Sequence, residues 1–112
     1  MSADSFHVWY GVRYEVEASD TATVELLEGR RHPWQLAARQ HALQSWWGTT
    51  TDEHRIFVLV GRIVGHYGWE GESAGQLADA EATTIMAVTA ERLRTAGIEG
   101  RPAWHFQFEP DR

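Results

Sequence analysis

The chain has 112 residues, 43% of them hydrophobic, and a formal net charge of -6. This length predicts one globular domain over residues 1–112, and the acidity argues against nucleic acid or an anionic membrane as a partner. Cysteine and lysine are both absent, which excludes disulfides, thiolate nucleophiles, Cys-based zinc sites and Schiff-base chemistry on lysine. We expect no cofactor.

The first five residues have neither a basic region nor an apolar core, so they do not form a signal peptide. We therefore expect a cytoplasmic protein. Residues 6–16 then alternate strictly between apolar and polar types, which predicts a half-buried antiparallel strand. Residues 21–27 also alternate and are consistent either with a second strand or with a short helix capped by Asp20.

Two segments have the pattern of helices. The first begins at Pro33 and is expected to run to about Trp46, with the threonines of residues 49–51 as a candidate edge strand. The second is expected to begin at Ser73, because Ser73 and Gln76 have capping-box spacing. It should end at Gly97, where Gly followed by Ile is typical of a Schellman motif.

The centre of the predicted sheet is residues 56–60, five consecutive apolar residues rich in β-branched types. Glycines follow at positions 61, 65, 68 and 71, where we expect the backbone to bend or to be approached closely. A phosphate loop is a poor alternative, because neither a G-x-G-x-x-G spacing nor a G-K-[ST] ending is present.

The last predicted strand is residues 103–109, with Trp104, Phe106 and Phe108 on the side assigned to the core. Helices separated by strands in this way tend to cover one face of a sheet. We therefore predict an α+β fold with a mainly antiparallel sheet and two helices packed on one face. A ferredoxin-like split βαβ arrangement is the first choice.

The polar groups after the central strand are the candidate site. His66, Tyr67 and Glu70 include the residue types of general acid–base catalysis, although nothing in their spacing is specific to one reaction. In an extended strand His66 would share a face with Glu70 and Glu72, while Tyr67 and Trp69 would point the other way. The wider set of candidate ligand or interface residues is Trp9, Arg62, His66, Tyr67, Trp69 and Glu72.

Six histidines raise the question of a metal. Their spacing matches neither H-E-x-x-H nor a compact zinc pattern, so we expect no metal site. A site assembled from distant strands, such as His7 with His105, stays open as a minor alternative.

Six tryptophans in so short a chain are the most unusual feature. Trp9 lies opposite the predicted core face, so the second face of the sheet should carry exposed aromatic surface. The first hypothesis is a small binding or protein-interaction domain without catalysis that forms a homodimer through this face or takes a protein or an apolar small molecule. The alternative is a small enzyme that performs acid–base chemistry on an apolar or aromatic molecule with His66 and Glu70.

Overall fold

The computed structural model describes residues 4–109. The outer ends of the predicted 1–112 domain, including most of the segment judged not to be a signal peptide, lie outside this range. The described residues form four strands and three helices in the order β1 (Ser5–Glu17), α1 (Thr21–Glu28), α2 (Pro33–Gln40), β2 (Gln44–Thr49), β3 (Arg55–Gly68), α3 (Asp79–Thr95) and β4 (Ala103–Glu109). None of the described helices is both long and apolar enough to cross a membrane.

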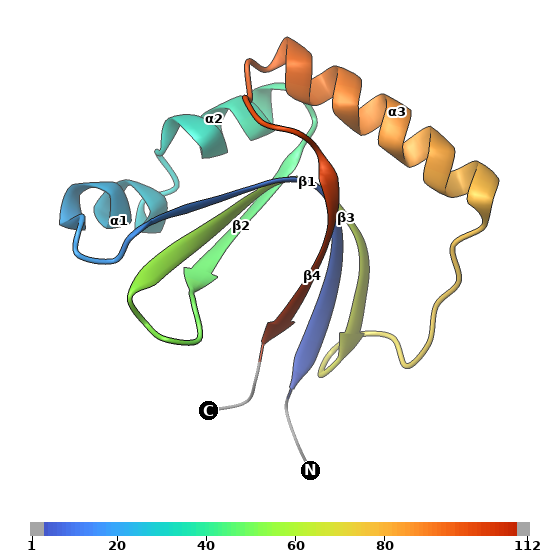
Figure 1. Ribbon diagram of the computed structural model, residues 1–112, viewed down its shortest axis with the longest axis horizontal. Helices are drawn as coiled ribbons and strands as arrows, with labels where there is room; N and C mark the ends of the chain where they lie inside the picture. Colours follow the sequence, from blue (N-terminus) through green and yellow to red (C-terminus); the bar gives the residue numbers. More distant parts are fainter. Residues whose placement is uncertain (1–3, 110–112) are drawn as a thin grey trace.

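The four strands form one antiparallel sheet in the order β2-β3-β1-β4. The α1–α2 pair connects β1 to β2, and α3 connects β3 to β4. Each connection therefore skips one strand, as in the split βαβ arrangement. The helices lie on the same side of the sheet (Figure 1). The predicted α+β class with a mainly antiparallel sheet is confirmed.

Both central strands of the sheet bend (Figure 1), and Gly11 and Gly61 face each other near the middle of β1 and β3. A Cβ on Gly11 would lie 2.2 Å from the Val60 carbonyl oxygen, and one on Gly61 would lie 2.2 Å from the Tyr10 carbonyl oxygen. Only glycine permits backbones to approach this closely. In Figure 1 both strands rise to the top of the sheet and descend on its other side.

The bend divides the sheet into two arms. The first arm contains residues 12–17 of β1 and 55–60 of β3, and it includes β2. The second arm contains residues 5–10 and 62–68, and it includes β4. A bulge between Val8 and Trp9 adds local twist to the second arm. The helices cover the outer side of the bend and leave the inner side free of helices (Figure 1).

The main core lies between the first arm and the helices. Val58 and Val60 of β3 are fully buried there with Leu27 of α1, and Leu93 of α3 joins them. Complete burial of each such side chain is worth about 1.5–3 kcal/mol before the cost of ordering the chain. The prediction that residues 56–60 form the interior of the sheet is correct.

Residues 21–27 belong to α1, so the helical alternative is the correct one. The Asp20 side chain caps α1 by accepting a hydrogen bond from the Thr23 amide at 3.2 Å and one from the Thr23 hydroxyl at 2.7 Å. A side-chain cap of this kind satisfies a helix amide that would otherwise lack a partner.

The helix predicted for residues 33–46 is too long, because α2 ends at Gln40. Ala42 has a positive φ of 55°, and the Leu43 amide donates to the Ala38 carbonyl at 2.8 Å, which closes the helix. Trp46 and Trp47 therefore lie in β2 and not in a helix. Trp47 faces the main core, and Trp46 points to the inner side of the bend.

The second helix was also predicted too early, because α3 begins at Asp79 and the capping box at Ser73 does not form. The chain instead runs beside the end of β3, where Glu72 pairs with Tyr67. The predicted end is correct: Gly97 has a φ of +73°, and the Ile98 amide donates to the Leu93 carbonyl at 3.0 Å.

Replacing Gly11 with alanine should lower the free energy of unfolding by about 1–3 kcal/mol or more, because the new Cβ meets backbone that cannot move aside. Urea denaturation measures the change. Gly29→Ala is the matched control, since its Cβ would meet mainly the flexible Arg31 side chain, and its effect should stay within about 0.5 kcal/mol. Equal effects of the two substitutions would contradict the role given to the glycine pair.

Candidate functional site

The predicted site residues fall on both sides of the sheet. Arg62 and Tyr67 lie on the helix side, where they help to line a cleft of about 450 Å³ beside α3. His66 points to the inner side of the bend, where its ring stacks on His7 at 4.5 Å. His66 and Tyr67 therefore do not face a common space.

Tyr67 explains several of the glycines after the central strand. A Cβ on Gly65 would lie 2.6 Å from the Tyr67 ring, and one on Gly75 would lie 2.1 Å from its hydroxyl oxygen. The ring also contacts Phe6, with centroids 6.4 Å apart. Of the four glycines predicted to be closely approached, Gly65 is the one that the Tyr67 side chain contacts, whereas the atoms nearest to a Cβ on Gly61, Gly68 or Gly71 belong to the backbone.

Glu70 and Glu72 do not continue the face of His66, which corrects the extended-strand geometry expected for them. β3 ends at Gly68, where φ is +90°, and Glu70 lies in the following turn with a φ of 56°. Both carboxylates are exposed, and Trp69 is 55% exposed. The structure therefore does not assemble His66, Tyr67 and Glu70 into one acid–base set.

Trp9 corrects the expectation of an exposed aromatic face. It lies on the inner side of the bend as predicted, but only 3% of its surface is exposed. Phe57, Leu59 and Ile63 surround it in a small second core at the base of the bend. The inner side is buried without helices because the two arms face each other.

The arms meet at their outer edges. The Trp46 indole N–H of β2 donates to Glu109 Oε1 of β4 at 3.0 Å, although these strands lie at opposite edges of the sheet. The Trp46 ring also lies 5.4 Å from the ring of His7 in the second arm. Between the arms is a cleft of about 350 Å³, lined by Arg13, Thr49, Thr50, Thr51, Phe57, Gln107, Phe108 and Glu109.

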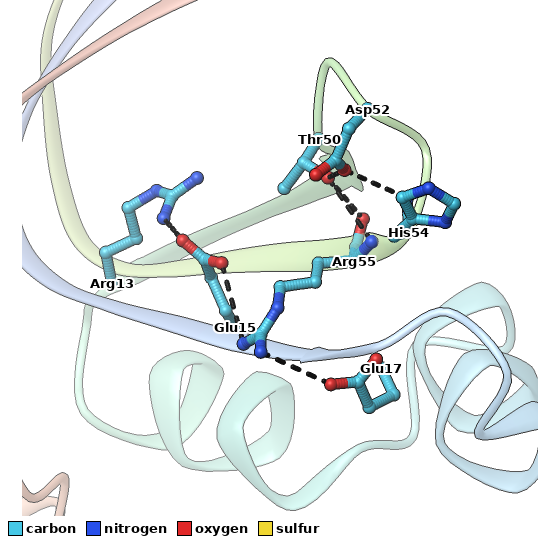
Figure 2. Close-up of polar contacts among 7 residues, drawn as sticks. All are labelled: Arg13, Glu15, Glu17, Thr50, Asp52, His54 and Arg55. Carbon is cyan, nitrogen blue, oxygen red and sulfur yellow. Dashed lines mark hydrogen bonds and ion pairs between the residues drawn. The ribbon is translucent and has the colours of Figure 1, made fainter.

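A row of charged side chains runs along the first arm beside this inter-arm cleft (Figure 2). Arg13 pairs with Glu15, and Arg55 contacts both Glu15 at 3.8 Å and Glu17 at 3.3 Å. Exposed pairs of this kind each contribute about 0–1 kcal/mol. They nevertheless neutralise Arg13, whose guanidinium lies 5.4 Å from the centre of the Phe57 ring.

The turn between β2 and β3 contributes Thr50 and Thr51 to the rim of the inter-arm cleft, and Figure 2 shows the polar contacts within this turn. Asp52 Oδ1 accepts hydrogen bonds from the His54 amide at 3.0 Å and the Thr50 hydroxyl at 2.7 Å. These bonds favour the charged carboxylate and lower the pKa of Asp52. The Thr50 hydroxyl also lies 3.1 Å from the Arg55 carbonyl, which ties the rim to β3.

Two buried polar atoms on the inner side have no hydrogen-bond partner. They are Nδ1 of His7, a residue 7% exposed, and Nε1 of Trp9. An unsatisfied buried donor or acceptor typically costs about 1–3 kcal/mol. Burial lowers the pKa of His7 and nearby His66 lowers it further, against a smaller opposing effect of Glu109. With the arms closed, these two buried atoms on the inner side of the bend are thus left without a hydrogen bond.

The His105 ring, by contrast, has a hydrogen-bond partner. Its Nε2 lies 3.0 Å from the Gly11 carbonyl oxygen, and burial lowers its pKa. A metal held by His7 and His105 would have to break this contact. Over residues 4–109 no group of three or more His, Cys, Asp or Glu side chains is arranged to hold a metal ion.

A larger cavity of about 680 Å³ lies beside β2 and the α1–α2 pair, but its buried polar group is already paired. Gln35 Nε2 donates to the Leu27 carbonyl at 3.0 Å, and Gln35 Oε1 accepts from the His32 amide at 3.1 Å. This cavity therefore lacks the unmet polar groups found between the arms.

The side of β4 assigned to the core is largely exposed, which is a further correction. Trp104 is half-buried, but Phe106 is 65% and Phe108 is 52% exposed. The reason is that α3 packs mainly on β1 and β3 and leaves the outer face of β4 uncovered. Phe106 is covered in part by Phe6, whose ring stacks on it at 6.1 Å.

Sequence reasoning missed the contact that joins the two arms, which Trp46 makes with Glu109 and beside which the ring of His7 lies. The alternation of residues 6–16 already placed His7 on the face of Trp9. Trp46 was hidden by its assignment to a helix, and its contact with Glu109 depends on the bend. Comparison with known protein families, with curated proteins and with solved structures finds no match.

Stability should fall as the pH drops below about 6.5, the ordinary pKa of histidine. Because the folded-state pKa of His7 is lowered, the unfolded chain binds a proton first, and acid therefore favours unfolding. Urea midpoints at pH 7.5 and pH 5.5 measure the loss. His7→Phe should reduce this loss but not abolish it, because the pKa values of the half-buried His32 and His105 are also lowered by burial. An unchanged pH dependence in His7→Phe would contradict the burial of a neutral imidazole.

Proposed function

We propose that the protein is a non-catalytic binding domain that takes a small molecule with a flat apolar part between its two arms. The observation that carries this proposal is the pair of buried, unpartnered atoms, His7 Nδ1 and Trp9 Nε1, on the inner side of the bend, where Trp9 packs against Phe57 of the cleft lining. Ligand sites are typically apolar pockets with a few polar groups that fix orientation. As part of the same proposal we place the protein in the cytoplasm. The chain has no cysteine and therefore no disulfide bonds that a reducing compartment could break.

The geometry favours binding over the alternative of an acid–base enzyme. Such an enzyme was expected to use His66 with Glu70, yet Glu70 lies in the turn beyond β3 and His66 stacks on His7. A general base must reach the proton that it removes and be held in place by a partner. The structure gives His66 the stacked ring of His7 as its neighbour, and the carboxylate expected to assist it lies on the turn beyond the strand.

Indole serves as a probe of this proposal because it is flat and largely apolar. Titration should shift the NMR signals of Phe57 and of the Trp46 indole N–H. Trp46→Ala should weaken indole binding by about two- to tenfold, since an aromatic pair contributes about 0.5–1.5 kcal/mol beyond its buried area. Trp69→Ala is the control, because Trp69 is similarly exposed and lies outside the inter-arm cleft. Shifts centred on Trp69 or Phe106 would contradict the proposal.

A homodimer through β4 is a second candidate, favoured by the exposure of Phe106 and Phe108. β4 is an edge strand whose outer side is unpaired in the sheet, and its single charged residue is Glu109. Edge strands without protecting charges or prolines tend to pair with another strand. A second copy of β4, related by a two-fold axis, would pair these backbone groups and cover both phenylalanines.

The dimer candidate predicts a concentration-dependent mass by light scattering on a sizing column. Phe106→Asp should weaken the dimer at least about tenfold, because a buried aromatic anchor commonly contributes more than 1 kcal/mol. Leu36→Asp is the matched control, since Leu36 is an exposed apolar residue on α2, at 40% exposure. A monomer at millimolar concentration would rule out this dimer and leave the small-molecule proposal intact.

A further inference from the structure

We propose that the ligand between the arms is a neutral, planar molecule with a carboxamide or lactam edge. This inference rests on the proposed binding function and adds the chemistry of the ligand. The amide carbonyl would accept from Trp9 Nε1, and the amide N–H would donate to His7 Nδ1. Trp46 and Phe57 would contact the faces of its ring.

The indole of Trp9 determines that the ligand carries a hydrogen-bond acceptor. An indole N–H donates and cannot accept, so it requires an acceptor from its partner. Trp9 is 97% buried, counted from its 3% exposure, and no described residue supplies that acceptor. A ligand cation, whose N–H groups also donate, would leave the Trp9 N–H unpaired.

The imidazole of His7 provides the partner for the hydrogen-bond donor of the ligand. Its ring stands between His66 of its own arm, at 4.5 Å, and Trp46 of the opposite arm, at 5.4 Å, so it faces the space between the arms. A buried imidazole is neutral, with one ring nitrogen that donates and one that accepts. His7 and Trp9 lie two residues apart on one face of β1, so their polar atoms can address adjacent groups of one ligand.

The charges around the inter-arm cleft argue for a neutral ligand. Glu109 lies at the closing edge with one oxygen bound to the Trp46 indole, and it would repel a ligand carboxylate. Arg13 lines the same cleft, but its ion pair with Glu15 offsets its charge. A neutral amide is not repelled by Glu109, and it supplies both the acceptor and the donor.

Trp46 is the residue that can admit the ligand. Its side chain belongs to an edge strand and is 42% exposed, so its displacement disturbs little of the core. The bond from Trp46 to Glu109 closes the arms over His7. Moving the Trp46 ring would uncover His7, which lies two residues from Trp9 on the same face of β1.

Four probes of nearly equal shape test the ligand chemistry: benzamide, acetophenone, toluene and benzoate. Each is titrated into the intact chain while the Trp9 indole N–H is followed by NMR. Benzamide should bind at least tenfold more tightly than toluene, with acetophenone between them because it has the acceptor but no donor. Benzoate should bind most weakly. The Trp9 indole proton should move downfield with benzamide and acetophenone but not with toluene.

His7→Phe keeps a ring of similar size and removes the nitrogen, so it should lower benzamide affinity to that of acetophenone. The Trp9 proton shift in the unsubstituted chain keeps the test valid if this variant does not fold. Equal binding of benzamide and toluene between the arms would overturn the ligand chemistry and leave the binding function standing, as would tightest binding of benzoate. Absence of any probe, indole included, from the inter-arm cleft would overturn both.

Discussion

The close approach of Gly11 and Gly61 is the constraint on which the rest of the structure depends. Two backbones can come this near only without side chains, and the contact bends both central strands at the same point. Because of the bend, the edge strands β2 and β4 face each other across the inner side of the sheet. A flat sheet of the same sequence would expose Trp9, Phe57 and Leu59, since no helix covers that side.

The inner side therefore combines a sealed base with a polar, aromatic opening. At the base, Trp9 packs among apolar side chains, and its N–H is buried without a partner. At the opening, Trp46 and Glu109 join the two arms, and the Arg13–Glu15 pair keeps the local charge balanced. Natural proteins tolerate unsatisfied buried groups rarely, and such groups therefore point to a ligand, an ordered water or stored strain. Their place between two edge strands is what favours a ligand.

Much of the fold could be predicted from local pattern. Strict alternation located β1, the run of five apolar residues located the centre of β3, and Gly97 located the end of α3. The adjacent tryptophans of β2 were misassigned because Trp46 and Trp47 are both large apolar residues that point to opposite sides of an edge strand, which leaves no clear period. The candidate site was predicted less well. Its members His7, Trp46 and Glu109 meet only through the bend, and a contact between opposite edges of a sheet leaves no local signal.

The two arms of the sheet are held to the rest of the molecule unequally. The larger core lies between the first arm and the helices, whereas β4 is held to the molecule by β1 along one side only. Segments with few buried apolar contacts are the first to open in native proteins. Amide hydrogens of β4 should accordingly exchange with solvent sooner than those of residues 56–60. Of the two edge strands that face each other across the inner side, β4 is therefore the one expected to separate first.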